Sequence, residues 1–501
     1  MLRISGNPKR TCAGTSRREL LIAGSLNSLA AATTANSAMA ITPSAALTSE
    51  TSESAESGTI APGFGRAKSV ICLFLFGGWS QLETFDMKPG APAEIRGPYK
   101  PISSSLPGIS VCEHLPQLSQ RMDRLALIRS VNSPDANHNT CMILTGHDGT
   151  VSGTATKGFN PGIPRDRPYF LSAIQHLKER DYRHSEHQHL PGNMCVPNRL
   201  GLLEGYYRTG PYGGFLGNRF DPVCTQFGSN GQLLYQPGGV NPETLSLIPD
   251  GASPVSDVNL DRLDQRRSLL QQLDRERQRL LKAASVESYQ FRERQVLDLL
   301  TSDRVRTALD LSMEPRQLRD RYGWNLFGQS VLLSRRLVEQ GVPLVTAIWD
   351  CTKEGSDIAG LGWDTHWDHF KACEGWLLPG IDAAISALLD DLESRGMMDD
   401  TLVVVLSEMG RTPKINSRAG RDHWVGSYCA LMAGAGIRPG VVHGETDAIA
   451  SAVTDAPVSP QDLLATVYHL TGLTPETLIH DRQNRPSLLY GDGRPVQNIL
   501  I

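Results

Sequence analysis

Short apolar segments that alternate with helical patterns constrain the fold of this chain more than any other feature. Residues 68–76 are almost wholly apolar and close on Gly77-Gly78. Such a continuous apolar run is typical of a strand that is buried on both faces of a parallel sheet. Similar apolar runs cover 125–128, 343–349, 402–406 and 429–432. The clearest helical patterns between them cover 325–339 and 380–396. The alternation predicts an α/β fold with a mostly parallel central sheet between helices.

Polar side chains follow the predicted strand 402–406, at the edge where open α/β sheets place their chemistry. Glu408 and Arg411 come first, and Arg421 and His423 follow shortly afterwards. A carboxylate, an imidazole and two arginines brought together suit a metal site that also binds an oxyanion. A salt-bridged strand end would show the same residues, so this motif alone leaves both interpretations open.

A second polar group comes after the predicted strand 343–349. Asp364 and His366 are two residues apart, so in an extended chain they lie on one face and can bind one ion. A carboxylate and an imidazole are compatible with Zn²⁺, Mn²⁺ or Fe²⁺ and do not select among them.

Two more groups are candidates for binding or catalysis. His138 and Thr140 precede a short predicted helix, whose free N–H groups favour an anionic ligand, although His138 could equally cap that helix. Ser80 follows the Gly77-Gly78 turn and either faces a ligand or closes the turn. We interpret the segment that contains the histidines at 184, 187 and 189 as a solvated loop and not as a dedicated metal site.

The first forty residues have the features of an export signal. A basic region leads into Arg17-Arg18, two leucines and an Ala-rich run that ends at Ala40. This order is typical of a twin-arginine signal peptide, here residues 1–40, and residues 41–65 are expected to form a flexible Ser/Thr/Ala-rich tether. We therefore expect export to the bacterial periplasm or the cell exterior, and a single folded domain over residues 66–501. Cleavage would leave 44 basic and 52 acidic residues from the original 49 and 53, so the formal charge would change from −4 to −8.

Composition excludes several classes of protein. The near balance of 49 basic and 53 acidic residues provides no basic field for nucleic acid. No run of about 18 apolar residues is present, so no membrane span is expected. Residues 257–311, rich in Arg, Gln and Leu, predict a helical insertion beside the sheet. The oligomeric state is left open.

Taken in order, the motifs resemble the bacterial domain-of-unknown-function 1501 family. They are Phe76-Gly77-Gly78-Trp79-Ser80, Asn137-His138-Asn139-Thr140, Trp363-Asp364-Thr365-His366, Glu408-x-Gly410-Arg411-Thr412-Pro413 and Gly420-Arg421-Asp422-His423-Trp424. The resemblance covers about residues 68–500. It implies an alkaline phosphatase-like fold, in the superfamily of sulfatases and phosphomutases, but it supplies no known reaction.

The resemblance also implies roles for individual residues. The expected metal ligands are Asp364, His366, Glu408 and His423. They would bind one divalent ion, with zinc, manganese, calcium and magnesium not distinguished. The expected anion-binding residues are Ser80, Arg411 and Arg421. The expected catalytic residues are His138, Thr140 and Arg411, with His138 handling a proton and Thr140 or Ser80 as outside candidates for a nucleophile.

The sequence departs from the superfamily pattern at several positions. Gly77 and Gly78 stand where metal-binding aspartates are usual, Met409 where His or Asn is usual, and Ala136 where the nucleophile would be. One metal site and a directly attacking water are therefore expected in place of a two-metal covalent mechanism. The leading hypothesis is an exported metal-dependent hydrolase of phosphate, sulfate or related esters, with a small-molecule or glycan substrate. The alternative is a non-catalytic relative that binds an anionic ligand, such as a sulfated or phosphorylated glycan.

Overall fold

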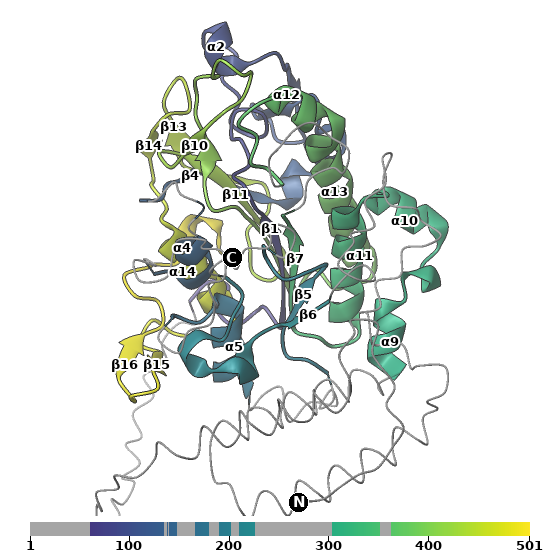
Figure 1. Ribbon diagram of the computed structural model, residues 1–501, viewed down its shortest axis with the longest axis vertical. Helices are drawn as coiled ribbons and strands as arrows, with labels where there is room; N and C mark the ends of the chain where they lie inside the picture. Colours follow the sequence, from purple (N-terminus) through teal and green to yellow (C-terminus); the bar gives the residue numbers. More distant parts are fainter. Residues whose placement is uncertain are drawn as a thin grey trace, which may run out of the picture. The chain divides into compact units, whose positions relative to one another are not determined.

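The centre of the molecule is a sheet whose strands follow the order β12-β4-β11-β8-β1-β7-β5-β6 (Figure 1). The strands are, in that order, Val441–His443, Ala126–Val131, Tyr428–Ala433, Thr401–Leu406, Ser69–Leu75, Leu344–Trp349, Met194–Val196 and Val223–Cys224. Within the described part of the sheet, β11 alone runs against its neighbours, β4 and β8. The predicted class, α/β with a mostly parallel sheet between helices, is confirmed.

The computed structural model describes residues 61–134, 138, 140–147, 166–179, 190–201, 210–225, 303–350 and 362–501. The predicted signal, most of the predicted tether and most of the predicted helical insertion lie outside these residues, as do Ala136 and the histidines at 184, 187 and 189.

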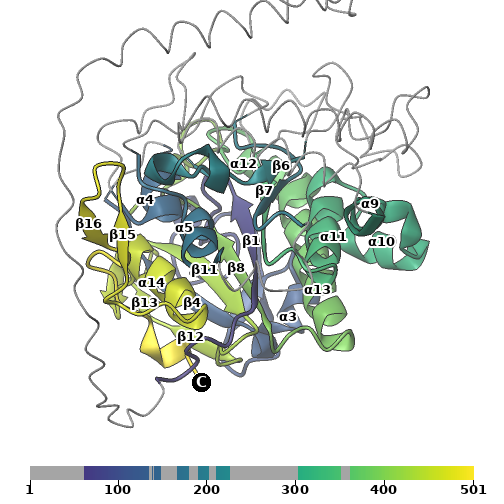
Figure 2. The same cartoon turned by 90° about the horizontal axis from the view of Figure 1, so that it is seen from below.

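Alternate residues of β1 pack into two separate hydrophobic cores. Ile71, Leu73 and Leu75 face the core covered by helices α3 (Pro116–Ser119), α11 (Leu326–Glu339) and α13 (Leu378–Ser394). Val70 and Phe74 face the core covered by α4 (Thr140–Thr145), α5 (Phe170–Leu177) and α14 (Pro460–Leu470). Figure 2 shows the two helical layers on opposite sides of the sheet. Every residue of β1 is buried, which explains why the strand is recognisable as an unbroken apolar run.

The described helices and small hairpins are as follows. The helices are α2 (Ala93–Arg96), α3 (Pro116–Ser119), α4 (Thr140–Thr145), α5 (Phe170–Leu177), α9 (Asp303–Leu309), α10 (Arg316–Tyr322), α11 (Leu326–Glu339), α12 (His369–Ala372), α13 (Leu378–Ser394) and α14 (Pro460–Leu470). The hairpins are β2 (Pro101–Ser103) with β3 (Ser110–Cys112), β9 (Gly410–Arg411) with β10 (His423–Trp424), β13 (Glu445–Thr446) with β14 (Val453–Asp455), and β15 (Leu478–His480) with β16 (Pro486–Leu488).

One helical stretch, His369–Ser394, is long and apolar enough to cross a membrane by length and composition. Most of its apolar window, 72%, is buried inside the protein, and α13 packs on α11 and α10. Core helices of globular proteins share these properties, so the stretch by itself does not indicate a membrane span.

The topology places the ends of several strands at one edge of the sheet. β1, β7 and β8 are parallel and therefore finish at the same edge, where β11, running the other way, begins. Asp364 and Glu408 follow β7 and β8, and His423 precedes β11. His138 follows β4, which is also antiparallel to β11 and so ends at the same edge. Distant parts of the sequence thus meet at the carboxyl edge.

Candidate metal centre

The turn after β1 brings the ends of two neighbouring strands together. The Gly77 N–H donates to Glu408 Oε1 (2.8 Å), just beyond β8. Gly78 has a φ of 84°, and a Cβ there would lie 2.8 Å from Met409 Cγ and 3.2 Å from the Gly410 carbonyl oxygen. Only glycine meets both demands at position 78, so Gly78 serves close backbone packing.

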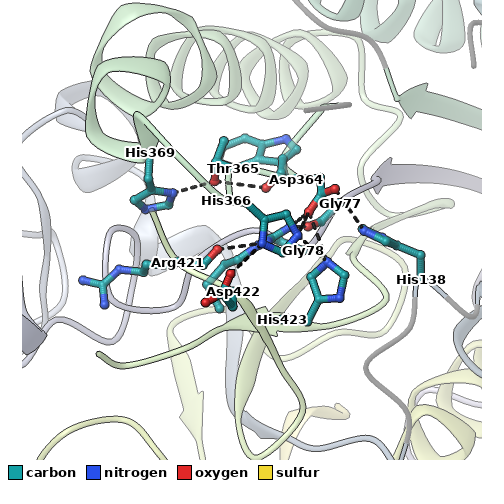
Figure 3. Close-up of polar contacts among 12 residues, drawn as sticks. Gly77, Gly78, His138, Asp364, Thr365, His366, His369, Arg421, Asp422 and His423 are labelled. Carbon is teal, nitrogen blue, oxygen red and sulfur yellow. Dashed lines mark hydrogen bonds and ion pairs between the residues drawn. The ribbon is translucent and has the colours of Figure 1, made fainter. Parts of the chain in front are cut away.

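Three histidines and one aspartate converge at this edge (Figure 3). Asp364 Oδ1 lies 3.0 Å from His366 Nε2 and 3.1 Å from His423 Nε2, and Asp364 Oδ2 lies 3.2 Å from His138 Nε2. The two Nε2 atoms of His366 and His423 are 3.0 Å apart. These side chains are 12–24% exposed, so the cluster is shielded but open to solvent.

Two of these histidines also contact a second carboxylate, through the ring nitrogen Nδ1. The Nδ1–H of His366 donates to Asp422 Oδ1 (2.7 Å), and the Nδ1–H of His138 donates to Glu408 Oε1 (2.9 Å). A carboxylate on the far nitrogen fixes the ring orientation and the tautomer of a ligand histidine. Glu408 was expected among the ligands and His138 was expected to transfer a proton. In the structure His138 lies in the group of possible ligands, and Glu408 contacts it from outside that group.

The donor set fits a divalent transition-metal ion. The four ligand atoms lie within 4.8 Å of one another. Tetrahedral zinc with bonds of about 2.0–2.1 Å separates its ligand atoms by about 3.3 Å. The contacts given above are 3.0–3.2 Å long, and the other pairs of ligand atoms are up to 4.8 Å apart. Three imidazole nitrogens and one carboxylate oxygen favour zinc, manganese or iron over calcium and magnesium, which prefer oxygen ligands.

The backbone at His138 is strained. Its φ is 51°, in the left-handed region that few residues with a side chain adopt. Its ring lies 5.0 Å from that of Phe76 and 4.2 Å from that of His423, measured between centroids. An unfavourable conformation that places a histidine against other polar groups is a feature of functional sites.

Protons and charges are strongly coupled in the cluster. Burial alone would raise the pKa of Asp364, but hydrogen bonds from the three histidines and the charge of Arg411 hold that pKa well below its usual range. Burial would lower the pKa of His138, yet its bonds to Asp364 and Glu408 raise it to about 9. The hydrogen bond to Asp364 also raises the pKa of His366, against the effect of burial. An ion that binds here must displace protons from these histidines.

Arg411 is fully buried beside the cluster. Its Nη2 donates to Asp364 Oδ1 (2.7 Å) and to the Gly77 carbonyl oxygen, its Nε to the Gly78 carbonyl oxygen (2.9 Å), and its Nη1 to the Arg421 carbonyl oxygen (3.1 Å). Arg411 thus compensates the charge of Asp364 and holds the turn after β1. The contact with a bound anion that the sequence suggests stays a prediction.

Arg421 has a different role from the one expected. Its Nε and Nη2 donate to Glu83 Oε1 (3.1 and 2.5 Å), and its remaining N–H groups donate to the carbonyl oxygens of Ile95, Thr412 and Pro413. All five N–H donors therefore have protein acceptors, and the side chain is fully buried. Because no N–H donor remains for an anion, we assign Arg421 a structural role, in which it holds Glu83 and three backbone carbonyl groups in place.

The hydrogen bonds of Arg421 and Glu83 extend to the loop that carries Asp364 and His366. Glu83 Oε2 accepts a hydrogen bond from His369 Nε2 (2.9 Å), and the Thr365 hydroxyl donates to His369 Nδ1 (2.6 Å). Thr365, His369 and Glu83 are all buried. Since Thr365 lies between the two candidate ligands, this network fixes the backbone from which they project.

The two candidate nucleophiles are buried. Thr140 begins α4, and its backbone N–H donates to the His138 carbonyl oxygen (3.0 Å). Ser80 is 1% exposed, and its hydroxyl has no hydrogen-bond partner among the described residues. Neither residue belongs to the ligand group, so their catalytic and anion-binding roles stay predictions.

Sequence reasoning missed the two residues that complete the centre. The sequence did not predict the role of Asp422 beside His366, although its place directly before His423 was a usable signal. Glu83 was not connected with Arg421, from which it is 338 residues distant.

Together, the fold and the cluster define an α/β protein with a candidate transition-metal centre at the carboxyl edge of a mostly parallel sheet. The sequence matches the family model described as "Protein of unknown function (DUF1501)" over residues 67–500, and the chain belongs to that family. This is the family that the motifs resemble. No curated protein matches the sequence.

Several solved structures are similar to the chain. They include the PsFucS1 sulfatase from Pseudoalteromonas sp. (12% identity, 87% of this chain and 72% of that one, TM-score 0.38) and a phosphonate monoester hydrolase from Silicibacter pomeroyi (12%, 86% and 76%, 0.34). A protein in the alkaline phosphatase superfamily from Vibrio parahaemolyticus also matches (10%, 82% and 68%, 0.37). Likeness at this level of identity and TM-score carries no argument about the activity of this chain.

Proposed function

We propose that this protein is an exported, metal-dependent hydrolase of phosphate, sulfate or related esters. The supporting observation is the convergence of three histidine Nε2 atoms and the Asp364 carboxylate within 4.8 Å of one another. A divalent ion held by these residues would polarise the ester and lower the pKa of a water, to about 7 for zinc.

The chain's own residues would keep the ligands in place. Glu408 holds the Nδ1 proton of His138, Asp422 holds that of His366, and Arg411 compensates the charge of Asp364. A His138 that binds through Nε2 cannot also transfer a proton at that atom. The proton-transfer role expected for His138 is therefore not part of this proposal.

The alternative, a non-catalytic relative, is favoured by the number of ligands. Four protein ligands fill a tetrahedral zinc site, as in structural zinc sites, whereas catalytic sites keep one position open. In that case the ion would join the segments around 138, 364 and 423, and any ester or glycan would bind elsewhere.

Metal analysis of the purified full-length chain tests the centre. Wild type and the His480→Ala control, altered at an exposed histidine of β15, should each retain one equivalent of zinc or manganese after dialysis. Asp364→Ala and His423→Ala should both lose it. A metal-free wild type whose stability is unchanged in both variants would overturn the proposal.

Hydrolysis then separates the two functions. Metal-loaded wild type should release phenol from aryl phosphates or aryl sulfates, and both ligand variants should be inactive while His480→Ala stays active. Stoichiometric metal without turnover of either ester class would favour the non-catalytic alternative.

Export is a separate proposal that rests on the twin-arginine motif. Replacing Arg17 and Arg18 together by lysine should retain the protein in the cytoplasm. Replacing Arg3 and Arg10 by lysine is the matched control, and it should leave the protein in the periplasmic fraction. Equal fractionation of the two double variants would contradict this route.

A further inference from the structure

The strands β5 and β6 lie side by side at one end of the described strand order (Figure 1). Cys195 of β5 is directly opposite Cys224 of β6 in this parallel pair. The Val223 N–H donates to the Asn193 carbonyl oxygen (2.9 Å) on one side of the pair. The Thr225 N–H donates to the Cys195 carbonyl oxygen (3.0 Å) on the other side. Hydrogen bonds therefore fix the register that brings the two cysteines together.

Both cysteine side chains point to the same face of the sheet. Directly opposed residues of a parallel pair share a face. In agreement with this rule, Cys195 belongs to the core covered by α4, α5 and α14, and Cys224 packs against the same core. Burial raises the pKa of the Cys195 thiol, and the adjoining Cys224 thiol raises that pKa further. The two thiols are thus neighbours in the core as well as along the backbone.

The spacing of the two strands suits a disulfide bond. Paired strands lie about 4.7–4.9 Å apart, and disulfides join residues whose Cα atoms are about 4.4–6.8 Å apart. Cys72 occupies the same row of the sheet, but Thr346 of β7 lies between it and Cys195. Two strand spacings, about 9–10 Å, exceed the reach of a disulfide. Cys195 can therefore bond to Cys224 but not to Cys72.

The two thiols differ in how easily an oxidant reaches them. Cys195 is fully buried, whereas Cys224 is partly exposed. The Cys224 thiol makes one weak hydrogen bond, with 3.8 Å between its sulfur and the Pro222 carbonyl oxygen. β6 has only two residues, so a small shift of this strand can bring the sulfur atoms together. Cys224 is therefore the thiol that an oxidant meets first.

We propose that Cys195 and Cys224 form a disulfide bond that fastens β6 to the sheet when the protein meets a disulfide oxidant. The Cys224 sulfur attacks one sulfur of the oxidant, whose other sulfur leaves and takes up the Cys224 proton. The Cys195 sulfur then displaces the oxidant's remaining sulfur, which takes up the Cys195 proton. Two cysteine thiols are thereby oxidised to one disulfide, and the oxidant disulfide is reduced to two thiols. This proposal does not depend on the proposed hydrolase.

Mass spectrometry of the purified full-length chain tests the bond. The chain is reduced, the reductant is removed, and the folded protein is incubated with excess oxidised glutathione. The remaining thiols are then alkylated in denaturant. Trypsin should release the peptides 184–199 and 220–262 joined to each other in most molecules. Each of these peptides contains one cysteine, so the mass of the joined pair identifies the bond.

Two variants separate this bond from other pairings. Cys224→Ala should give no joined peptides and should leave Cys195 as a thiol. Cys72→Ala is the matched control, because Cys72 lies in the same row of the sheet but one strand too far away, and it should keep the bond. Glutathione attached to Cys224 without a bond to Cys195, a bond from either cysteine to another one, or two free thiols in wild type would each overturn the proposal.

The melting temperature tests whether the bond fastens β6. A bond between residues 195 and 224 restricts the unfolded chain, so oxidised wild type should melt about 4 °C above its reduced form. Cys224→Ala should melt at one temperature under both conditions. All samples contain a chelator, so that the candidate metal centre does not contribute to the difference. Equal melting temperatures for oxidised and reduced wild type would overturn the fastening role.

Discussion

The buried ion pair between Glu83 and Arg421 offers a sharp test of how the site is held together. Both side chains are at most 1% exposed, and Arg421 donates to Glu83 through Nε and Nη2. Glu83→Gln keeps the size of the side chain but removes its charge, and so resembles the protonated glutamic acid. The substitution leaves the Arg421 charge buried without its carboxylate partner.

The pKa of Glu83 gives the size of the effect. Burial would raise this pKa, but the charge of Arg421, with the hydrogen bonds from Arg421 and His369, lowers it from the ordinary 4.5 to about 2. At about 1.4 kcal/mol for each pH unit, the ionised carboxylate contributes about 3 kcal/mol to the free energy of unfolding. Breaking a buried ion pair typically costs about 3–5 kcal/mol, so the two values agree.

The sign of the pH dependence follows from the direction of the shift. A carboxyl whose pKa is lower in the folded protein stabilises the fold above its unfolded pKa, here 4.5. That contribution decreases as the pH falls towards about 2. The free energy of unfolding of wild type should therefore exceed that of Glu83→Gln by about 3 kcal/mol at pH 7 and by about 1 kcal/mol at pH 3. We call this difference the gap.

Urea unfolding of metal-free protein at the two pH values measures this gap. Glu374→Gln, at an exposed position of the helix after α12, is the control and should match wild type within about 0.5 kcal/mol at both pH values. A gap below about 1 kcal/mol at pH 7, or a gap that does not change with pH, would refute the reasoning.

Three further predictions concern the metal centre and the helical layer. Glu408→Gln and Asp422→Asn should each weaken zinc binding about 10- to 100-fold in a chelator competition, because each carboxylate orients a ligand histidine; unchanged affinity in both would remove that role. Gly420→Ala should lower the metal content and the melting temperature together, since a Cβ there would collide with the His366 carbonyl group; a fully loaded variant would contradict this packing. Arg335→Met should cost about 3–5 kcal/mol in urea unfolding, because this fully buried arginine neutralises several carboxylates, and a loss below about 1 kcal/mol would count against it.

The main strands could be predicted because burial on both faces leaves an unbroken apolar run. β8, predicted over 402–406, extends over Thr401–Leu406, and α11 and α13 also lie within two residues of their predicted limits. The strands β5 and β6 were not predicted. Strands of three and two residues are too short to show a period.

The site could be predicted only in part, because sequence spacing does not say which atom of a side chain faces its neighbours. Asp364, His366 and His423 were expected together and do converge. His138 and Glu408 were also selected, but their roles depend on which imidazole nitrogen meets which carboxylate, and only the folded arrangement decides this.

The dispersed origin of the four candidate ligands has a consequence for the stability of the whole chain. His138 and His423 are 285 positions apart in the sequence, yet their ring centroids are 4.2 Å apart. An ion shared by them would act as a reversible cross-link that closes a very long loop, and its binding free energy would count as folding free energy. Removal of the ion by a chelator should therefore lower the free energy of unfolding of the whole chain.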